Sequence, residues 1–393
     1  MAARILSADH RHAAGGIRVR LEPVVDLDRL GDVWRELEPR SEASFFQSWG
    51  WIGCWLRHLG PDRQPLAAIA ERDGRTVGLG VFVACRGKQR RTLGARRLRL
   101  HESGEPVLDA VCIEHNGLLA DRAHAPAVWT AILATLKCAP GWDELVFGGL
   151  DRRTAELCIA AARALDLGIV VRRRRASAHL DLEGLGRSGR TMTDLLSRNT
   201  RQQLARARRL YQASGPLRLH AAQSAGEALA MLDRLKAWHQ RTWQRRGRPG
   251  CFASPVFEAF HRDLIRSRFR HGEILLLCAS AGERSFGYLY NFARSGHIYA
   301  YQSGFDYTDD GRLKPGLVSH ALAIEHALRD NVVVYDFLAG ENRLKASFAS
   351  DREEMVWLAL QRRTARAWLE RRVAGLKALG RRGAASLGAG GSP

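Results

Sequence analysis

The pentapeptide at residues 75–79, Arg-Thr-Val-Gly-Leu, returns 209 positions later as Arg-Ser-Phe-Gly-Tyr at residues 284–288. Each copy follows a short turn sequence, Asp73-Gly74 in the first case and Gly282-Glu283 in the second. A glycine turn between two apolar runs is typical of a β-hairpin. Five matching positions prove little by themselves, because the pattern is that of a generic hairpin. A duplication must therefore be supported by the order of the surrounding elements.

The elements around both hairpins follow the same order. Periodicity and turn residues predict in the first half strand 17–25, helices 27–38 and 48–59, strands 66–72, 76–85 and 111–119, helix 125–137, strand 144–147, helix 153–165 and strand 169–182. The second half repeats this with strand 217–221, helices 225–246 and 255–270, strands 273–280, 285–293 and 297–305, helix 316–329, strand 332–337, a short helix around 343–349 and strand 354–361. We therefore predict an α/β protein of two tandem repeats, each a mixed central sheet flanked by helices.

The first repeat is longer than the second. From Gly78 to Phe147 there are 69 residues, but from Gly287 to Phe337 there are 50. We place this insertion of about nineteen residues in the arginine-rich region 86–110. The expected domain limits are a flexible N-terminus (1–16), an N-terminal domain (17–185), a connecting segment (186–215) with a helix from about 192 to 211, a C-terminal domain (216–363), and a C-terminal helix and tail (364–393).

The composition is that of a globular protein with a strong positive charge. Hydrophobic residues make up 46% of the 393 positions, which excludes a disordered or fibrous chain. The 61 Lys and Arg residues against 41 Asp and Glu give a net charge of +20, which suits acidic partners such as nucleic acid, anionic lipid or phosphorylated substrates. The seven cysteines stand singly with no metal-ligand spacing, so we expect reduced core residues and no metal site. Without a signal peptide or a membrane-spanning run, we expect a cytoplasmic protein, with contact to the inner membrane face left open.

Several motifs carry a family resemblance. The element order resembles the GNAT acyltransferase fold, and two copies in tandem resemble the Fem peptidoglycan-bridge aminoacyltransferases. A narrower resemblance, to the cellulose-biosynthesis (CelD-like) acetyltransferases, covers residues 18–362 and rests on residues 45–51 (Phe-Phe-Gln-Ser-Trp-Gly-Trp), 301–306 (Tyr-Gln-Ser-Gly-Phe-Asp), 314–316 (Lys-Pro-Gly), 335–341 (Tyr-Asp-Phe-Leu-Ala-Gly-Glu) and Lys345. The resemblance implies acyl transfer, mostly by the second repeat, with acyl-CoA such as acetyl-CoA as co-substrate and no tightly bound cofactor. It also implies a small-molecule or glycan acceptor in exopolysaccharide or cell-envelope synthesis.

Lys314, Pro315 and Gly316 are the predicted donor-binding residues. They open an apolar helix, and Pro suits the first helical turn because its missing N–H would be unpaired there anyway. The free amides and the positive end of the helix dipole favour a pyrophosphate, with Lys314 as added charge. An ordinary helix start would have the same sequence. The chain also lacks the Q/R-x-x-G-x-G/A loop of typical GNAT enzymes, so acyl carrier protein and aminoacyl-tRNA remain alternative donors.

Asp336, Glu341, Lys345 and Tyr301 are the predicted catalytic residues. Asp336 ends a buried strand, and Glu341 follows a glycine turn, so either carboxylate could serve as general base. Lys345 could stabilise an oxyanion, and the Tyr301 phenol could protonate a leaving thiolate. A structural ion pair and aromatic core packing are the alternatives for these residues.

His239, Arg241 and Trp243 are the predicted acceptor-binding residues, on a helix that also carries further arginines. Packing of His239 in the core is the alternative. The basic helix at 198–210 could bind phosphates or anionic lipid, although a solvated surface explains it equally well. We predict direct attack of an amine or hydroxyl on an acyl thioester. The rival hypotheses are a nucleic-acid-binding protein without sequence specificity and a scaffold without catalysis.

Overall fold

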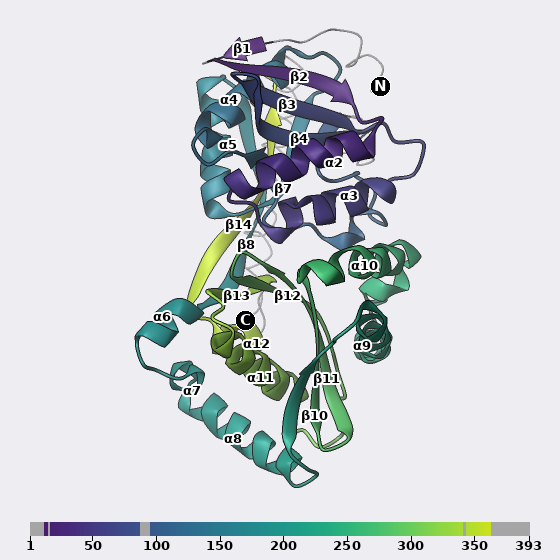
Figure 1. The fold of residues 1–393 in the computed structure, drawn as a ribbon, viewed down its shortest axis with the longest axis vertical. Helices are drawn as coiled ribbons and strands as arrows, with labels where there is room; N and C mark the ends of the chain where they lie inside the picture. The colour runs from purple at the N-terminus through teal and green to yellow at the C-terminus, as the bar shows by residue number, and fades with distance from the viewer. Residues whose placement is uncertain (1–11, 15, 87–94, 341–342, 363–393) are drawn as a thin grey trace, which may run out of the picture.

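The structure, a computed structural model, describes residues 12–14, 16–86, 95–340 and 343–362. Its strands form one mixed sheet with the order β1-β2-β3-β4-β5-β7-β14-β8-β13-β12-β11-β10-β9, and β6 pairs with β4 outside this path (Figure 1). The strands are β1 (His12–Ala14), β2 (Ile17–Pro23), β3 (Leu66–Arg72), β4 (Arg75–Arg86), β5 (Arg96–Leu100), β6 (Leu119–Ala120), β7 (Glu144–Leu150), β8 (Gly168–Asp181), β9 (Leu217–Ala221), β10 (Ile274–Ala281), β11 (Arg284–Arg294), β12 (His297–Phe305), β13 (Val334–Ala339) and β14 (Asp351–Gln361). The predicted fold class, a mixed sheet flanked by helices, is confirmed.

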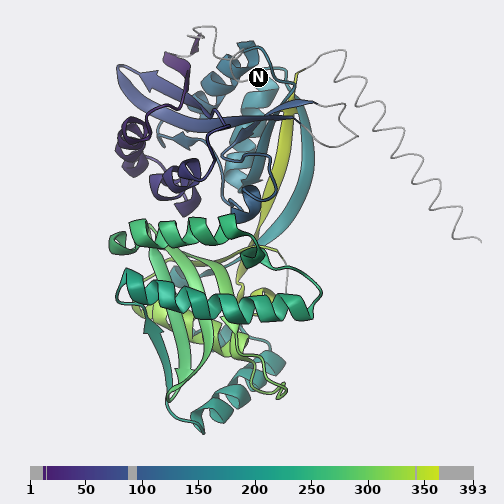
Figure 2. The same cartoon turned by 90° about the vertical axis from the view of Figure 1, so that its right-hand side faces the viewer.

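The helices form three layers against this sheet. They are α2 (Leu27–Leu37), α3 (Trp49–Arg57), α4 (Ala125–Cys138), α5 (Arg152–Ala164), α6 (Leu182–Arg187), α7 (Met192–Leu195), α8 (Arg198–Gln212), α9 (Ala225–Arg245), α10 (Pro255–Arg268), α11 (Pro315–Arg329) and α12 (Arg343–Phe348). Helices α4 and α5 cover one face of the first half, and α6, α7, α8, α11 and α12 share a core with the second half. Between the halves, α2, α3, α9 and α10 share a third core, and Figure 2 shows α10 next to the first half.

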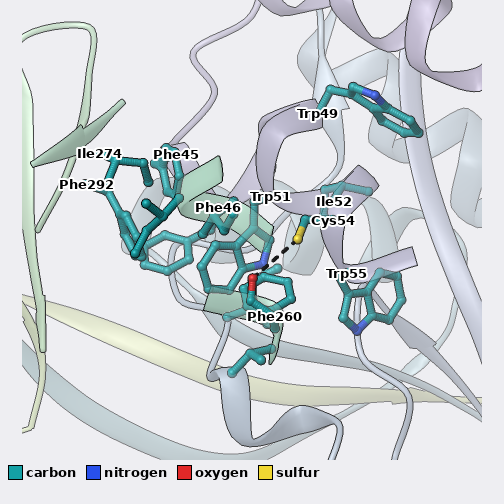
Figure 3. Packing of buried hydrophobic residues seen from close by; sticks show 14 of the residues in the cluster. Phe45, Phe46, Trp49, Trp51, Ile52, Cys54, Trp55, Phe260, Ile274 and Phe292 are labelled. Atoms are coloured by element: carbon teal, nitrogen blue, oxygen red, sulfur yellow. Dashed lines mark hydrogen bonds between the residues drawn. The ribbon is translucent and has the colours of Figure 1, made fainter. Parts of the chain in front are cut away.

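Aromatic side chains from both halves build this central core. The ring of Phe45 stacks on Phe292 with centroids 4.3 Å apart, and Trp51 meets Phe260 edge-on at 4.9 Å. Figure 3 shows these rings together with Cys54, whose Sγ donates to the backbone oxygen of Phe260. Fully burying one such ring contributes about 1.5–3 kcal/mol. The two halves therefore share a continuous apolar core.

The sheet register confirms the duplication. Gly78 pairs with Ala120 and Gly287 pairs with Phe305, both in antiparallel ladders. Each repeat also has a short parallel pair, residues 97–99 with 144–146 in the first and 297–299 with 334–336 in the second. Equivalent glycines thus occupy equivalent positions in two similar sheets.

The inserted residues interrupt one strand of the first repeat. Strand β12 is continuous, but its counterpart is divided into β5 and β6, with residues 101–118 between them. The predicted strand at 111–119 is therefore wrong except for its last residue, and the predicted site of the insertion ends too early. Val111 and Ile113 alternate like strand residues because they are buried in the central core, where they need no strand partner.

Two long strands connect the repeats. Strand β14 pairs with β8 over residues 351–361, and its end also pairs with β7 of the first repeat. The end of β8 pairs with β13 of the second repeat. The predicted connecting helix (192–211) is instead divided into the short α7 and the 15-residue α8, because the Ser197 hydroxyl caps a new helix at Thr200 N. The predicted C-terminal helix and tail (364–393) lie outside the described residues.

Candidate active site

The turn after β13 has an unusual backbone conformation. Leu338 has a φ of +61°, in the left-handed region that large side chains rarely adopt, and Gly340 follows with a φ of +108°. Leu338 is nevertheless buried, at 4% exposure, in the central core. A conformation of this kind costs about 1–3 kcal/mol and persists only where its surroundings enforce it.

Three charged side chains from separate segments hold this turn. The Leu338 amide donates to Asp336 Oδ1 at 2.6 Å, and the Ala339 amide donates to Glu114 Oε2 at 2.7 Å. Lys345 Nζ donates to the carbonyl oxygens of Leu338 and Ala339 at 3.0 and 3.1 Å. The polar groups of the turn are therefore fixed by ionisable side chains that also lie within electrostatic range of one another.

His115 forms an ion pair with Asp336 across the two repeats. Nε2 of His115 lies 2.8 Å from Oδ2 of Asp336, and both side chains are mostly buried. Burial alone would lower the pKa of the His115 imidazole. The charge of Asp336 and the hydrogen bond to it, with the nearby charges of Asp151 and Glu114, together outweigh burial and raise that pKa to about 9. Burial alone would raise the pKa of Asp336, but His115 and the Leu338 amide lower it below its usual value. The pair is therefore charged at neutral pH.

A cavity of about 660 Å³ lies between the repeats beside this pair. His179, Asp336 and Tyr299 form one row of its wall, because they are register partners across β8, β13 and β12. The first repeat supplies much of the remaining lining. These residues come from four segments, which are Ser41–Ser44 with Gln47, His115 with 118–120, the start of α4 and the start of α5. Most of the charged groups in the lining are paired, as in the Arg153–Glu42 contact and the Arg294 contacts with Glu38 and Glu273.

Strands β12 and β13 separate next to the cavity. They pair only over residues 297–299 and 334–336, and the chain then crosses through α11. The helix begins at Pro315, with Lys314 at its N-cap in the left-handed region at a φ of +47°. Pro315 and Gly316 are buried, and Gly316 lies against the ring of Phe305. The predicted donor residues thus stand at a helix N-terminus beside the open end of the strand pair.

The predicted catalytic residues are only partly brought together. Asp336 and Lys345 both hold the turn at 338–340, whereas Glu341 lies outside the described residues. Tyr301 is buried on β12 with its hydroxyl directed to the Val111 carbonyl oxygen at 2.5 Å and 3.1 Å from His261 Nε2. Burial raises the pKa of Tyr301 well above its ordinary value, so this phenol is neutral and already hydrogen-bonded.

The predicted acceptor residues lie elsewhere on α9. His239 is buried against Phe252 and Trp243, with ring centroids 5.2 and 5.8 Å away, and burial lowers its pKa. Arg241 is exposed. The structure thus gives His239 the packing of a core residue.

Sequence reasoning missed Glu114 and His115. Both come from the insertion that divides β5 from β6, and no periodic pattern marks them. The available signal was the insertion itself, because a long addition to one of two similar repeats is a place to look for added function. No group of His, Cys, Asp and Glu that could hold a metal ion occurs in the described part of the chain. Over the same residues, the helices are too short or too polar to cross a membrane.

Comparison with known proteins agrees with this fold. Residues 198–346 match the family model described as Acetyltransferase (GNAT) domain. The matched residues include α8 and most of the second repeat, which are therefore similar to a GNAT acetyltransferase domain. Among solved structures, FemX aligns with a TM-score of 0.56 at 9% identity, over 85% of this chain and 96% of its own. The L-PGS structure from Bacillus licheniformis aligns with a TM-score of 0.50 at 12% identity, over 88% and 96%.

A further structure is the C-terminal domain of an Agrobacterium fabrum protein assigned as a lysylphosphatidylglycerol synthetase. It aligns with a TM-score of 0.50 at 10% identity, over 90% of this chain and 97% of its own. At these identities the likeness concerns the fold. No curated protein shows a significant match to the sequence. The GNAT domain match supports transferase activity for this chain.

Proposed function

We propose that the protein transfers an acyl group from an acyl thioester to an amine or hydroxyl of a polar acceptor. The observation that carries this proposal is the strained turn at 338–340, held by Asp336, Glu114 and Lys345 where β12 and β13 separate. Buried ionisable groups around a strained backbone are typical of a reaction centre. A GNAT domain match over residues 198–346, which include the turn, Asp336 and Lys345, supports acyl transfer as the reaction.

The thioester would lie between β12 and β13, with its phosphates at the start of α11. Lys314 would supply a positive charge there, and the first free amides of α11 would supply donors. Acyl-CoA is the first donor to test. The acceptor would enter through the cavity between the repeats, whose wall includes His115, the chain neighbour of Glu114. The motif resemblance favours an acceptor from exopolysaccharide or cell-envelope synthesis.

We assign the general base to Glu114 in preference to Asp336. Burial raises the pKa of Glu114 above its ordinary value, whereas His115 lowers that of Asp336, which makes Asp336 the weaker base. In direct attack, the acceptor nitrogen or oxygen bonds to the thioester carbon while its proton passes to Glu114. The carbon–sulfur bond then breaks, and the thiolate leaves and takes a proton. Lys345 contributes positive charge beside the developing oxyanion.

Purified protein tests this directly through loss of the thioester. Acetyl-CoA is mixed with a panel of amino sugars, nucleotide sugars and amines, and the released thiol is measured. We expect at least one acceptor to release thiol faster than the uncatalysed reaction. With that acceptor, Glu114→Gln lowers kcat by about 10²- to 10⁴-fold, while acetyl-CoA binding changes little.

Asp336→Asn is the matched carboxylate variant. We expect it to lower the melting temperature more than Glu114→Gln does, because it leaves His115 buried and unpaired. The proposed function is wrong if the protein neither binds nor consumes any of three donors: acetyl-CoA, a longer acyl-CoA or an acyl-loaded carrier protein. If Glu114→Gln keeps full turnover, the base is another group.

A further inference from the structure

Helix α8 exposes a row of arginines. Its 15 residues include five arginines and no acidic residue. Leu204, Ala207 and Tyr211 are buried against the second repeat, and Arg208 pairs with Glu325 of α11 at 2.6 Å. The other four, which we call the arginine face, are exposed, and they are Arg198, Arg201, Arg206 and Arg209. At 1.5 Å per residue, the arginine face extends for about 16 Å along one side of the helix.

Asp194 and Asp310 lie within electrostatic range of Arg201 and Arg206, but neither pairs with the arginine face. Within the described ranges, none of its four guanidinium groups forms an ion pair, although Arg201 donates to the Leu196 carbonyl oxygen at 3.2 Å. By contrast, two arginines close to this surface are paired, Arg284 with Asp306 and Arg312 with Asp310. An exposed row of unpaired positive charge is a steering surface for an acidic partner.

The arginine face borders the segment that leads into α11. Helix α8 runs beside α11 on the outside of the second repeat (Figure 1), and Arg208 joins the two helices. The Arg312 side chain, with a smaller contribution from Arg206, lowers the pKa of Asp310 to about 2, so Arg206 is close to residues 306–314. Tyr307 in this segment is 43% exposed. An exposed tyrosine beside arginines is the composition of a protein-binding surface.

Residues 306–314 carry a net charge of −1, which disfavours a nucleotide. Asp306, Asp309 and Asp310 oppose Arg312 and Lys314 within this one segment. Free coenzyme A brings a diphosphate and a ribose phosphate, and so places several negative charges beside the three aspartates of this segment. A phosphopantetheine thioester on a carrier protein brings a single phosphate, and the rest of its recognition comes from the carrier surface. The arginine face supplies exposed positive charge next to this segment.

We propose that the arginine face docks an acidic acyl carrier protein, which delivers the thioester to the open end of β12 and β13. This rests on the acyl transfer proposed above. RNA fits less well, because single-stranded RNA sites commonly add several aromatic platforms and this surface offers Tyr307. A membrane fits less well, because the exposed large hydrophobic residues of the described chain are Val25, Val107, Val171 and Tyr307, none of them on α8.

Binding to an acetyl-loaded acyl carrier protein of net negative charge tests the proposal. The full chain is compared with the triple variant R198E/R206E/R209E and with the control R18E/R248E/R270E, whose arginines are also exposed. We expect the wild type and the control to bind the carrier alike, with affinity that falls as salt increases. The α8 variant should bind at least about tenfold more weakly and keep its acetyl-CoA affinity.

Unchanged carrier binding by the α8 variant overturns the proposal. The proposal is also overturned if the wild type binds structured RNA, or vesicles containing anionic lipid, more tightly than it binds the carrier and the α8 variant no longer shows that binding. A wild type that binds acetyl-CoA but not the carrier overturns the docking while the acyltransferase assignment stands. A wild type that binds neither thioester overturns both.

Discussion

His115 Nε2 lies 2.8 Å from Asp336 Oδ2 and joins the inserted segment of the first repeat to β13 of the second. The other oxygen of Asp336 accepts the Leu338 amide, so a single carboxylate connects the cavity wall to the strained turn. Any change in how the two repeats meet at His115 is therefore transmitted to the candidate reaction centre. This relationship makes the first repeat a structural part of the site.

A double-mutant cycle on this pair measures its energy. Asp336→Asn alone should lower the free energy of unfolding by about 3–5 kcal/mol, because a buried imidazolium is then left unpaired. His115→Gln should cost less, since Asp336 keeps the Leu338 amide. The coupling energy should lie between about 0.5 and 3 kcal/mol. Chemical denaturation of the four proteins gives these values, and strict additivity would show that the two residues do not interact.

The stability of the protein should fall at alkaline pH. The pKa of His115 rises from its ordinary 6.5 to about 9 on folding, so its contribution is complete below pH 6.5 and is lost as pH rises through about 9. Denaturant unfolding at pH 6.5, 8 and 9.5 should show this decline in the wild type. In His115→Gln the decline should shrink. An equal decline in both proteins would assign the effect to another group.

Two buried neutral histidines should lower the stability of the protein at acid pH. Burial lowers the pKa of His101 to about 4 and that of His320 to about 3, so below pH 6.5 the unfolded chain binds more protons than the folded one. The free energy of unfolding should therefore decrease as the pH is lowered from 6.5.

Substitution of Lys314 separates donor binding from backbone strain. Lys314→Gly removes the charge and suits the positive φ of this N-cap, so acetyl-CoA affinity should fall about tenfold while the unfolding free energy changes by less than about 1 kcal/mol. Lys314→Arg keeps the charge and should keep the affinity. Calorimetric titration gives the affinities. Tight binding by Lys314→Gly would remove this residue from the donor site.

The two repeat glycines should resist substitution. A Cβ on Gly78 would overlap the Cγ1 methyl of Val128 on α4, and one on Gly287 would overlap the Ser319 hydroxyl on α11. We expect Gly78→Ala to cost about 1–3 kcal/mol of unfolding free energy. Gly186→Ala on α6 is the matched control, because nothing lies near its Cβ position and Ala favours a helix by up to about 1 kcal/mol. Equal melting temperatures for both variants would contradict this packing.

Local sequence signals were enough to find the repeated architecture. The hairpins around Gly78 and Gly287 have their own turn residues, and α11 has Pro315 at its start, so each element is specified by residues within a few positions of it. Asp336 and Lys345 were found in the same way, because a strand end, a glycine turn and a short helix follow one another in the chain. The hairpin strands that were matched in sequence also occupy corresponding places in the two sheets.

Tertiary structure alone decided which groups meet. Val111 and Ile113 have a strand pattern, but they face the central core without strand partners, and this brings Glu114 and His115 to the turn at 338–340. Asp336 follows His115 by more than two hundred positions, and no local pattern relates them. The lowered pKa of Asp336 and the raised pKa of Glu114 are consequences of that contact and of burial. Charge, strain and proton affinity at this site therefore arise from long-range packing, which local sequence patterns do not encode.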